Sequence, residues 1–159
     1  MKGQVAKKEF KKGRARIKLH ELWSYVVRYR DGFACQWCLF DDRKNVNRCH
    51  HAHHIVARAL GKTAGSYELD NGVTLCYHCH IDRIKNEPDE YIAFRDAWLS
   101  GVVDPCPLND FSVDIEKYPR LRAKYQNQIV KFTEAFYVEH WKMLIAELER
   151  LGGHYEKSK

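Results

Sequence analysis

The sequence predicts an α+β protein that is mostly helical, with a small β-β-α unit between flanking α-helices. Two CxxC motifs, at residues 35–38 and 76–79, enclose two short segments that suit β-strands. Before and after this unit, apolar residues recur at helical spacing. So small a unit buries too little apolar surface to fold alone, so we expect a metal crosslink between its two ends.

The N-terminal part of the chain divides into an arm and a helix. Residues 1–16 have little apolar content, and we expect them to form a flexible basic arm that either binds a polyanion or only adds solubility. Its basic residues are Lys2, Lys7, Lys8, Lys11, Lys12, Arg14 and Arg16. From Ile17 the apolar residues follow one face of a helix, which Asp31 and Gly32 end because glycine suits the left-handed cap.

The predicted metal-bearing unit occupies residues 33–87. A knuckle at 35–38 comes first, then strands at 49–56 and 72–75, and then a helix at 79–86 that the following proline stops. These elements are the basis of the β-β-α prediction.

Two further helical segments follow the unit. Residues 89–99 suit a helix that packs on the core, and residues 119–151 suit one helix of up to about 30 residues or two stacked helices. We expect the apolar stripe of the second segment to pack on the core, to form a homodimer or to bind a protein partner. We therefore divide the chain into the arm (1–16), a domain with its helices (17–100), and a loop with a long helical extension (101–159).

Composition indicates the cellular setting and the partner. No run approaches the ~18 apolar residues of a membrane span, and the N-terminus lacks the apolar core of a signal peptide, so we expect a cytoplasmic protein without a membrane segment. Cytosolic reductants keep thiols reduced, which favours metal binding over disulfides. A formal net charge of +6 indicates a polyanionic partner, but it does not distinguish a nuclease from a passive binder.

The two CxxC motifs predict a structural zinc site. Cys35, Cys38, Cys76 and Cys79 would each place one thiolate on a tetrahedral Zn²⁺, because the two-residue gap brings both sulfurs of a pair within about 2.3 Å of the ion. Cys49 and Cys106 are better explained as small buried hydrophobes. Cys49 is nevertheless close enough to the histidines to compete as a soft ligand.

The string HAHHIVARALGKTAGSYELDNGVTLCYHCHIDRIKNE, with CQWC upstream, resembles the HNH endonuclease family. That family has an HH or DH dipeptide, a central Asn and a closing His inside a CxxCH motif. The resemblance covers about residues 33–87 and implies a zinc-stapled ββα-metal core. It also implies hydrolysis of DNA phosphodiesters by a one-metal mechanism that leaves 5′-phosphate and 3′-hydroxyl ends.

The resemblance and the chemistry together assign roles to four residues. His54 is the expected general base, because an imidazole titrates near neutral pH. His53 and His80 are the expected ligands of the catalytic ion, and adjacent strand residues such as His53 and His54 point to opposite sides. The family pattern implies that Asn71 holds the loop that carries His54, although Asn71-Gly72 is also a strong turn dipeptide.

Several assignments stay open. His51 would share a strand face with His53 and either joins the metal or is exposed to solvent. Some family members have a further metal-ligating His where this chain has Ile84, so only two imidazoles would hold the ion here. Nitrogen ligands favour Mn²⁺, Ni²⁺ or Zn²⁺, but a loosely held ion would also suit Mg²⁺, and the choice among these four stays open. The candidates for DNA contact are Arg58, Arg83, Lys85, Lys11, Lys12, Arg14 and Arg16. The alternative function is a noncatalytic zinc-containing module that binds nucleic acid.

Overall fold

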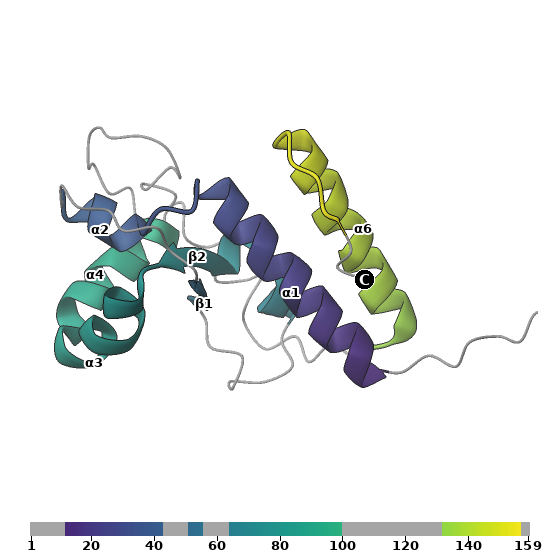
Figure 1. Cartoon of the computed structure of the whole chain (residues 1–159). Coiled ribbons are helices and arrows are strands. Elements are labelled where there is room, and N and C mark those ends of the chain that lie inside the picture. Colours follow the sequence, from purple (N-terminus) through teal and green to yellow (C-terminus); the bar gives the residue numbers. More distant parts are fainter. Residues whose placement is uncertain (1–11, 43–50, 56–63, 100–131, 157–159) are drawn as a thin grey trace, which may run out of the picture.

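The computed structural model describes residues 12–42, 51–55, 64–99 and 132–156. Several sequence predictions concern residues outside these ranges. They are the arm up to residue 11 with Lys11, the residues Cys49, Arg58 and Cys106, and the segment 100–131. The described part of the chain is mostly helical, with a two-stranded antiparallel sheet at its centre (Figure 1).

The centre of the fold is the predicted β-β-α unit. Strand β1 (His51–His54) pairs antiparallel with β2 (Gly72–Leu75), with His51 opposite Leu75 and His54 opposite Gly72. Short 3₁₀ turns, η2 (Ala64–Tyr67) and η3 (Leu69–Asn71), precede β2. A π-helix, η4 (His78–Arg83), follows β2 and continues into α3 (Ile84–Asn86). The α+β prediction and the position of the second strand are therefore confirmed.

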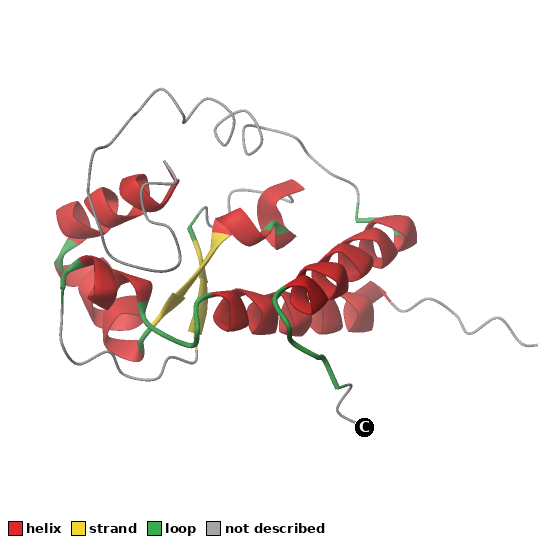
Figure 2. Cartoon of the chain, turned by 90° about the horizontal axis from the view of Figure 1, so that it is seen from above, coloured by secondary structure: helices red, strands yellow, loops and turns green. Residues whose placement is uncertain are grey.

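Helices cover both faces of this hairpin (Figure 2). On one side lie α2 (Gln36–Phe40), η4, α3 and α4 (Pro88–Leu99). Their buried residues, with those of β2, form a cluster that we call the cysteine-side core. It consists of Cys35, Trp37, Cys38, Ile55, Val73, Leu75, Cys76, Cys79, Phe94 and Trp98. Pro88 stops the preceding helix, as predicted, and is itself the first residue of α4, a position that suits its fixed φ.

On the other side, α1 (Lys12–Arg30) packs along α6 (Glu134–Arg150), as Figure 1 shows. Their shared cluster, the helix-pair core, also includes a tyrosine from η2. It consists of Leu19, Leu22, Trp23, Val26, Val27, Tyr67, Phe136, Tyr137, Leu144 and Leu148. The apolar face of α6 is thus used for packing within the chain. Of the described residues, no helix has both the length and the apolar character needed to cross a lipid bilayer.

Helix α1 starts earlier and α6 starts later than the sequence indicates. Helix α1 begins at Lys12 rather than Ile17, because good helix formers in 12–16 outweigh the single Gly13. The arm boundary at residue 16 is therefore wrong. The Thr133 side chain accepts a hydrogen bond from Phe136 N at 3.2 Å and caps α6, so one continuous helix over 119–151 is also wrong.

Two features of the sequence fix α1 against the hairpin. Gly72 is needed for close approach, since a Cβ at this position would lie 2.5 Å from Val27 Cγ2 and 2.7 Å from Trp23 Cζ2. At the end of α1, the buried Asp31 Oδ2 accepts a hydrogen bond from Thr74 N at 2.7 Å, and its Oδ1 accepts one from Arg30 Nε at 2.8 Å. Arg30 also donates to the carbonyls of Leu69 and Gly72. These hydrogen bonds therefore join α1 to η3 and to β2.

Candidate metal centre and active site

The four predicted zinc ligands form one buried cluster. Cys35 is the N-cap residue of α2 and Cys38 lies within that helix, whereas Cys76 directly follows β2 and Cys79 lies in η4. Their Sγ atoms all lie within 4.8 Å of one another, with Cys38 3.5 Å from Cys79 and 3.9 Å from Cys76. Four sulfurs at about 2.3 Å from a tetrahedral ion would be roughly 3.8 Å apart. The cluster therefore has the size of a four-cysteine zinc site.

The electrostatics of this cluster also favour a cation. Hydrogen bonding with Cys38 and Cys79 lowers the pKa of the Cys35 thiol to about 4. The hydrogen bond with Cys35, with a further one from Cys79, raises the pKa of Cys38 far above its ordinary value. Without a cation the sulfurs thus share protons, because four adjacent thiolates repel one another. A divalent ion would favour the fully deprotonated set.

Arg83 belongs to this cluster and not to a DNA-binding surface. It is only 2% exposed, and its Cζ lies 3.9 Å from the centre of the Trp37 ring. The guanidinium pairs with Asp41 at 2.7 Å and with Glu87, and its Nη1 lies 3.6 Å from Cys79 Sγ. The prediction that it contacts DNA is therefore wrong. A side chain with two carboxylate partners and an aromatic face is fixed in place by this packing.

On the same side of the hairpin, the predicted ligands of the catalytic ion face each other. The ring centres of His53 and His80 are 5.0 Å apart. Burial, then the neighbouring His80 and His54, lowers the pKa of His53 to about 4, and burial followed by His51 lowers the pKa of His80. Both imidazoles are therefore neutral near pH 7, which is the form that binds a metal.

Two further contacts bear on metal binding by these histidines. His80 Nδ1 is buried and has no hydrogen-bond partner in the described residues, a state that a bound ion would relieve. His53 Nε2 is hydrogen-bonded to Tyr91 Oη at 2.8 Å. Such an outer contact orients an imidazole and leaves Nδ1 as the nitrogen for an ion. The residues present thus fit a divalent cation.

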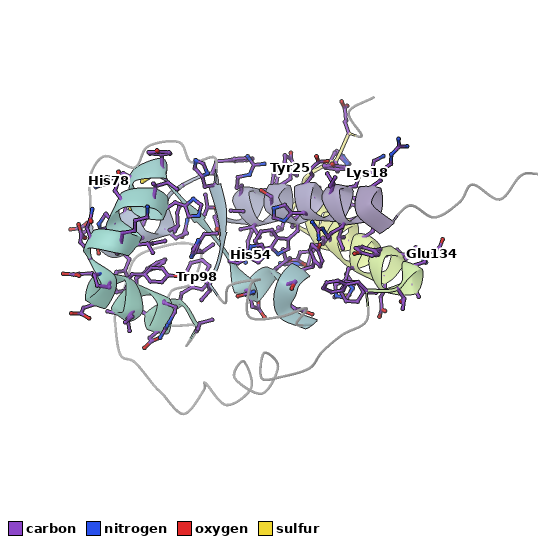
Figure 3. All side chains as sticks on the ribbon, turned by 90° about the horizontal axis from the view of Figure 1, so that it is seen from below. Lys18, Tyr25, His54, His78, Trp98 and Glu134 are labelled. Carbon is purple, nitrogen blue, oxygen red and sulfur yellow. The ribbon has the colours of Figure 1, made fainter. Side chains whose placement is uncertain are left out.

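His54 occupies a different environment from its neighbour, because it points to the other face of the hairpin. Figure 3 shows His54 beside α1. Its ring stacks on Trp23 of α1, with ring centres 3.9 Å apart, and the His20 ring stacks near both. His54 Nε2 lies 2.9 Å from the carbonyl oxygen of Ser66. A carbonyl only accepts, so Nε2 carries the proton and Nδ1 is the basic nitrogen.

Asn71 is buried at the end of η3, directly before β2. Its backbone carbonyl accepts a hydrogen bond at 3.0 Å from the amide of Ile55, the residue after His54. Gly72 has extended backbone, with φ −115° and ψ 141°, so Asn71-Gly72 is not a left-handed turn. Asn71 therefore ties the end of β1 to the start of β2, next to His54.

Sequence reasoning did not identify the residues that support these histidines. Trp23, Ser66 and Tyr91 all act through tertiary contacts, and no local pattern marks them. Trp23 is further fixed by a hydrogen bond from its Nε1 to the carbonyl of Glu68 at 3.1 Å. Its helical spacing indicated only a core residue.

The other predicted basic contacts are distributed along the chain. Lys85, Arg14 and Arg16 are exposed, with Lys85 on α3 and the two arginines on the first turns of α1. Lys12 begins α1. None of these residues joins the histidines in a common cluster among the described contacts.

One family model matches the central part of the chain. Residues 35–85 match the family described as HNH endonuclease, a span that includes all four cysteines, His53, His54, Asn71 and His80. No curated protein and no solved structure matched the chain.

Proposed function

We propose that this protein, in which residues 35–85 form an HNH endonuclease domain, is a metal-dependent DNA endonuclease. The domain belongs to a family that acts on nucleic acid. The finer assignment is that His54 is the general base of a one-metal hydrolysis that leaves 5′-phosphate and 3′-hydroxyl ends. The four-cysteine cluster, with a zinc ion bound, would hold the hairpin and the following helix in register.

One observation carries this proposal: two adjacent histidines of β1 lie in opposite environments. His53 faces His80, and both stay neutral. His54 is held by a carbonyl and an aromatic ring that together fix its tautomer and its plane. A phosphate at the edge of β1 that β2 does not cover would meet both side chains, because they are neighbours on the strand. A site with a purely structural role would not need two neighbouring histidines in such different surroundings.

The residues support a simple proton transfer. His54 Nδ1 takes a proton from a water whose oxygen attacks phosphorus in line with the leaving group. A bond from this oxygen to phosphorus forms, the bond from phosphorus to O3′ breaks, and O3′ takes a proton from solvent. An ion held by His53 and His80, when bound, supplies charge stabilisation on the phosphate and on O3′. Asn71 and Trp23 keep the base in place and take no part in the bond changes.

The electrostatic contacts with DNA would come from exposed lysine and arginine side chains other than the proposed catalytic residues. Lys85 follows η4, and Arg16 lies one helical turn before His20 of the aromatic stack. The predicted contacts Arg58 and Lys11, and the side chain of Lys12, lie outside the described residues. The net charge of +6 favours such binding, and each neutralised phosphate would add a slope of about −0.9 in log K against log salt.

The test is cleavage of supercoiled plasmid by the zinc-loaded chain, with and without added divalent ion. His54→Ala should retain ion and DNA binding and reduce the rate by roughly 10²–10⁴, the usual contribution of a general base. His154→Ala removes an exposed histidine after α6 and serves as the matched control. His80→Ala should instead weaken ion binding, with partial rescue by excess metal.

Two results would reject the proposal. DNA binding without cleavage in any divalent ion would establish the noncatalytic zinc module. Equal loss of ion binding in His54→Ala and His80→Ala would show that base and ligand are wrongly assigned. End-labelling of the products would decide the 5′-phosphate assignment separately.

A further inference from the structure

His51 has surroundings that the endonuclease assignment does not use. It lies on β1 two residues before His53, so the two side chains share one face of the strand. Its ring is half-buried, and its centre is 5.2 Å from the centre of the His80 ring. His80 therefore has two imidazoles as neighbours, since the centre of the His53 ring also lies 5.0 Å from that of His80.

The separations of the His51 and His53 rings from the His80 ring are those of imidazoles that share an ion. An imidazole nitrogen lies about 2.0–2.1 Å from a tetrahedral Zn²⁺, and the ring centre about 1.1 Å further out. Two such rings then have centres about 5 Å apart. Both distances from His80 agree with this value.

The described surroundings of the His80 ring supply few other polar partners. His80 Nδ1 is buried without a hydrogen bond in the described part of the chain. Beyond His51 lies Tyr77, which is 63% exposed, so this side is open to a substrate. The ring nitrogens do not converge as closely as the four sulfurs do. Rotation about the soft Cβ–Cγ bonds of His51 and His80 turns their nitrogens while it leaves the ring centres nearly in place, and His53 keeps its contact with Tyr91.

We propose that His51 is a third ligand of the divalent ion, in a three-histidine site formed by His51, His53 and His80. This inference rests on the proposed endonuclease function and specifies its metal. Three neutral nitrogen ligands select a borderline transition ion such as Zn²⁺, Co²⁺ or Ni²⁺, whereas Mg²⁺ prefers oxygen. Three protein ligands also leave coordination positions for water and for a phosphate oxygen.

The test is Co²⁺ binding to the full chain with its four-cysteine site already filled by zinc, followed by calorimetry and visible absorption. His51→Ala should weaken Co²⁺ binding by at least about tenfold, at the lower end of what mutations around metal sites cost. His51→Gln, which keeps the size of the side chain, should do the same. His80→Ala should weaken binding at least as much. Near-ultraviolet thiolate absorption would report any exchange of Co²⁺ into the four-cysteine site.

His78→Ala is the matched control, because His78 lies on the same helix as His80 but is exposed and pairs with Asp82. It should bind Co²⁺ like the parent protein, and Mg²⁺ binding should be unchanged in all the His51 variants. Zinc content and far-ultraviolet circular dichroism of each variant would show that the fold is retained.

The outcomes separate this inference from the proposed function. If His51→Ala and His51→Gln bind Co²⁺ as tightly as the parent while His80→Ala does not, His51 is no ligand and the endonuclease assignment stands. Cleavage by the parent protein in Mg²⁺ without uptake of Co²⁺ would also overturn the three-histidine site alone. If the parent takes up no ion beyond the four-cysteine site and cleaves no DNA, both proposals fail.

Discussion

The two faces of the β1–β2 hairpin are covered by cores of different construction. The cysteine-side core consists of short elements, of which α2 has five residues and α3 three, around four sulfur atoms. The helix-pair core consists of two long amphipathic helices, α1 with 19 residues and α6 with 17. Long helices bury a continuous apolar face, whereas short ones cannot stabilise themselves and depend on a crosslink.

This difference extends to the proposed catalytic residues. His51, His53 and His80 lie on the face that depends on the cysteine cluster, whereas His54 stacks on Trp23 of the helix pair. The proposed ligands and the proposed base are therefore held by separate cores, and the hairpin keeps them adjacent. Metal binding and base positioning should accordingly respond to different mutations.

The largest expected effect is removal of the structural metal. Chelation or Cys76→Ser should unfold the cysteine-side core, because structural zinc supplies on the order of 10 kcal/mol to domains of this kind. Hydrogen exchange followed by mass spectrometry should show loss of protection in α2, β2 and η4 before α1 and α6. Zinc should restore the chelated protein but not the variant. Equal and simultaneous loss over both regions would mean that the two cores unfold as one unit.

The sequence predicted the cysteine-side region better than the helix-pair region, for a physical reason. The spacing of the two CxxC pairs and of His80 along the chain largely determines how these residues are arranged in space. The four-cysteine cluster and the strand at 72–75 were therefore predicted correctly. The contact of Trp23 with His54 spans 31 residues and depends on how α1 crosses the hairpin, which no local pattern specifies. The long-range contacts of Arg83 were missed for the same reason.

A cavity in the helix-pair core should have the next largest effect. Leu148 of α6 is 1% exposed, and Leu148→Ala should lower the free energy of unfolding by about 3 kcal/mol, within the range for buried leucines. Zinc content and Co²⁺ binding should not change, because the cysteine cluster and the histidines proposed as ligands lie on the other face. The measurement is urea unfolding followed by tryptophan fluorescence, with metal analysis of the folded variant.

Met143→Ala is the matched control for this change, since Met143 lies on the same helix but is 50% exposed. It should alter the free energy of unfolding by no more than about 0.5 kcal/mol. Loss of bound zinc in Leu148→Ala would contradict the independence of the two cores.

The smallest expected effect tests the junction between the cores. Asp31 closes α1 and accepts hydrogen bonds from Arg30 and from the amide of Thr74 in β2. Asp31→Ala leaves the Thr74 amide buried without this partner, a loss of about 2 kcal/mol, while Arg30 keeps the carbonyls of Leu69 and Gly72 as acceptors. Asp96→Ala, which breaks an exposed pair with Arg95, should cost at most about 1 kcal/mol.

The position of Asp31 adds a functional consequence to this small loss. Thr74 lies opposite Ala52, whose neighbours on β1 are the proposed ligands His51 and His53, two residues before the proposed base His54. Faster exchange of the Thr74 amide in Asp31→Ala should therefore accompany a lower cleavage rate at saturating metal, with Co²⁺ affinity unchanged, because α1 and His54 shift relative to an intact cysteine cluster. If Asp31→Ala instead weakens Co²⁺ binding and leaves the rate intact, the junction stabilises the ligand face and not the base. The division of the active site between the two cores would then be wrong.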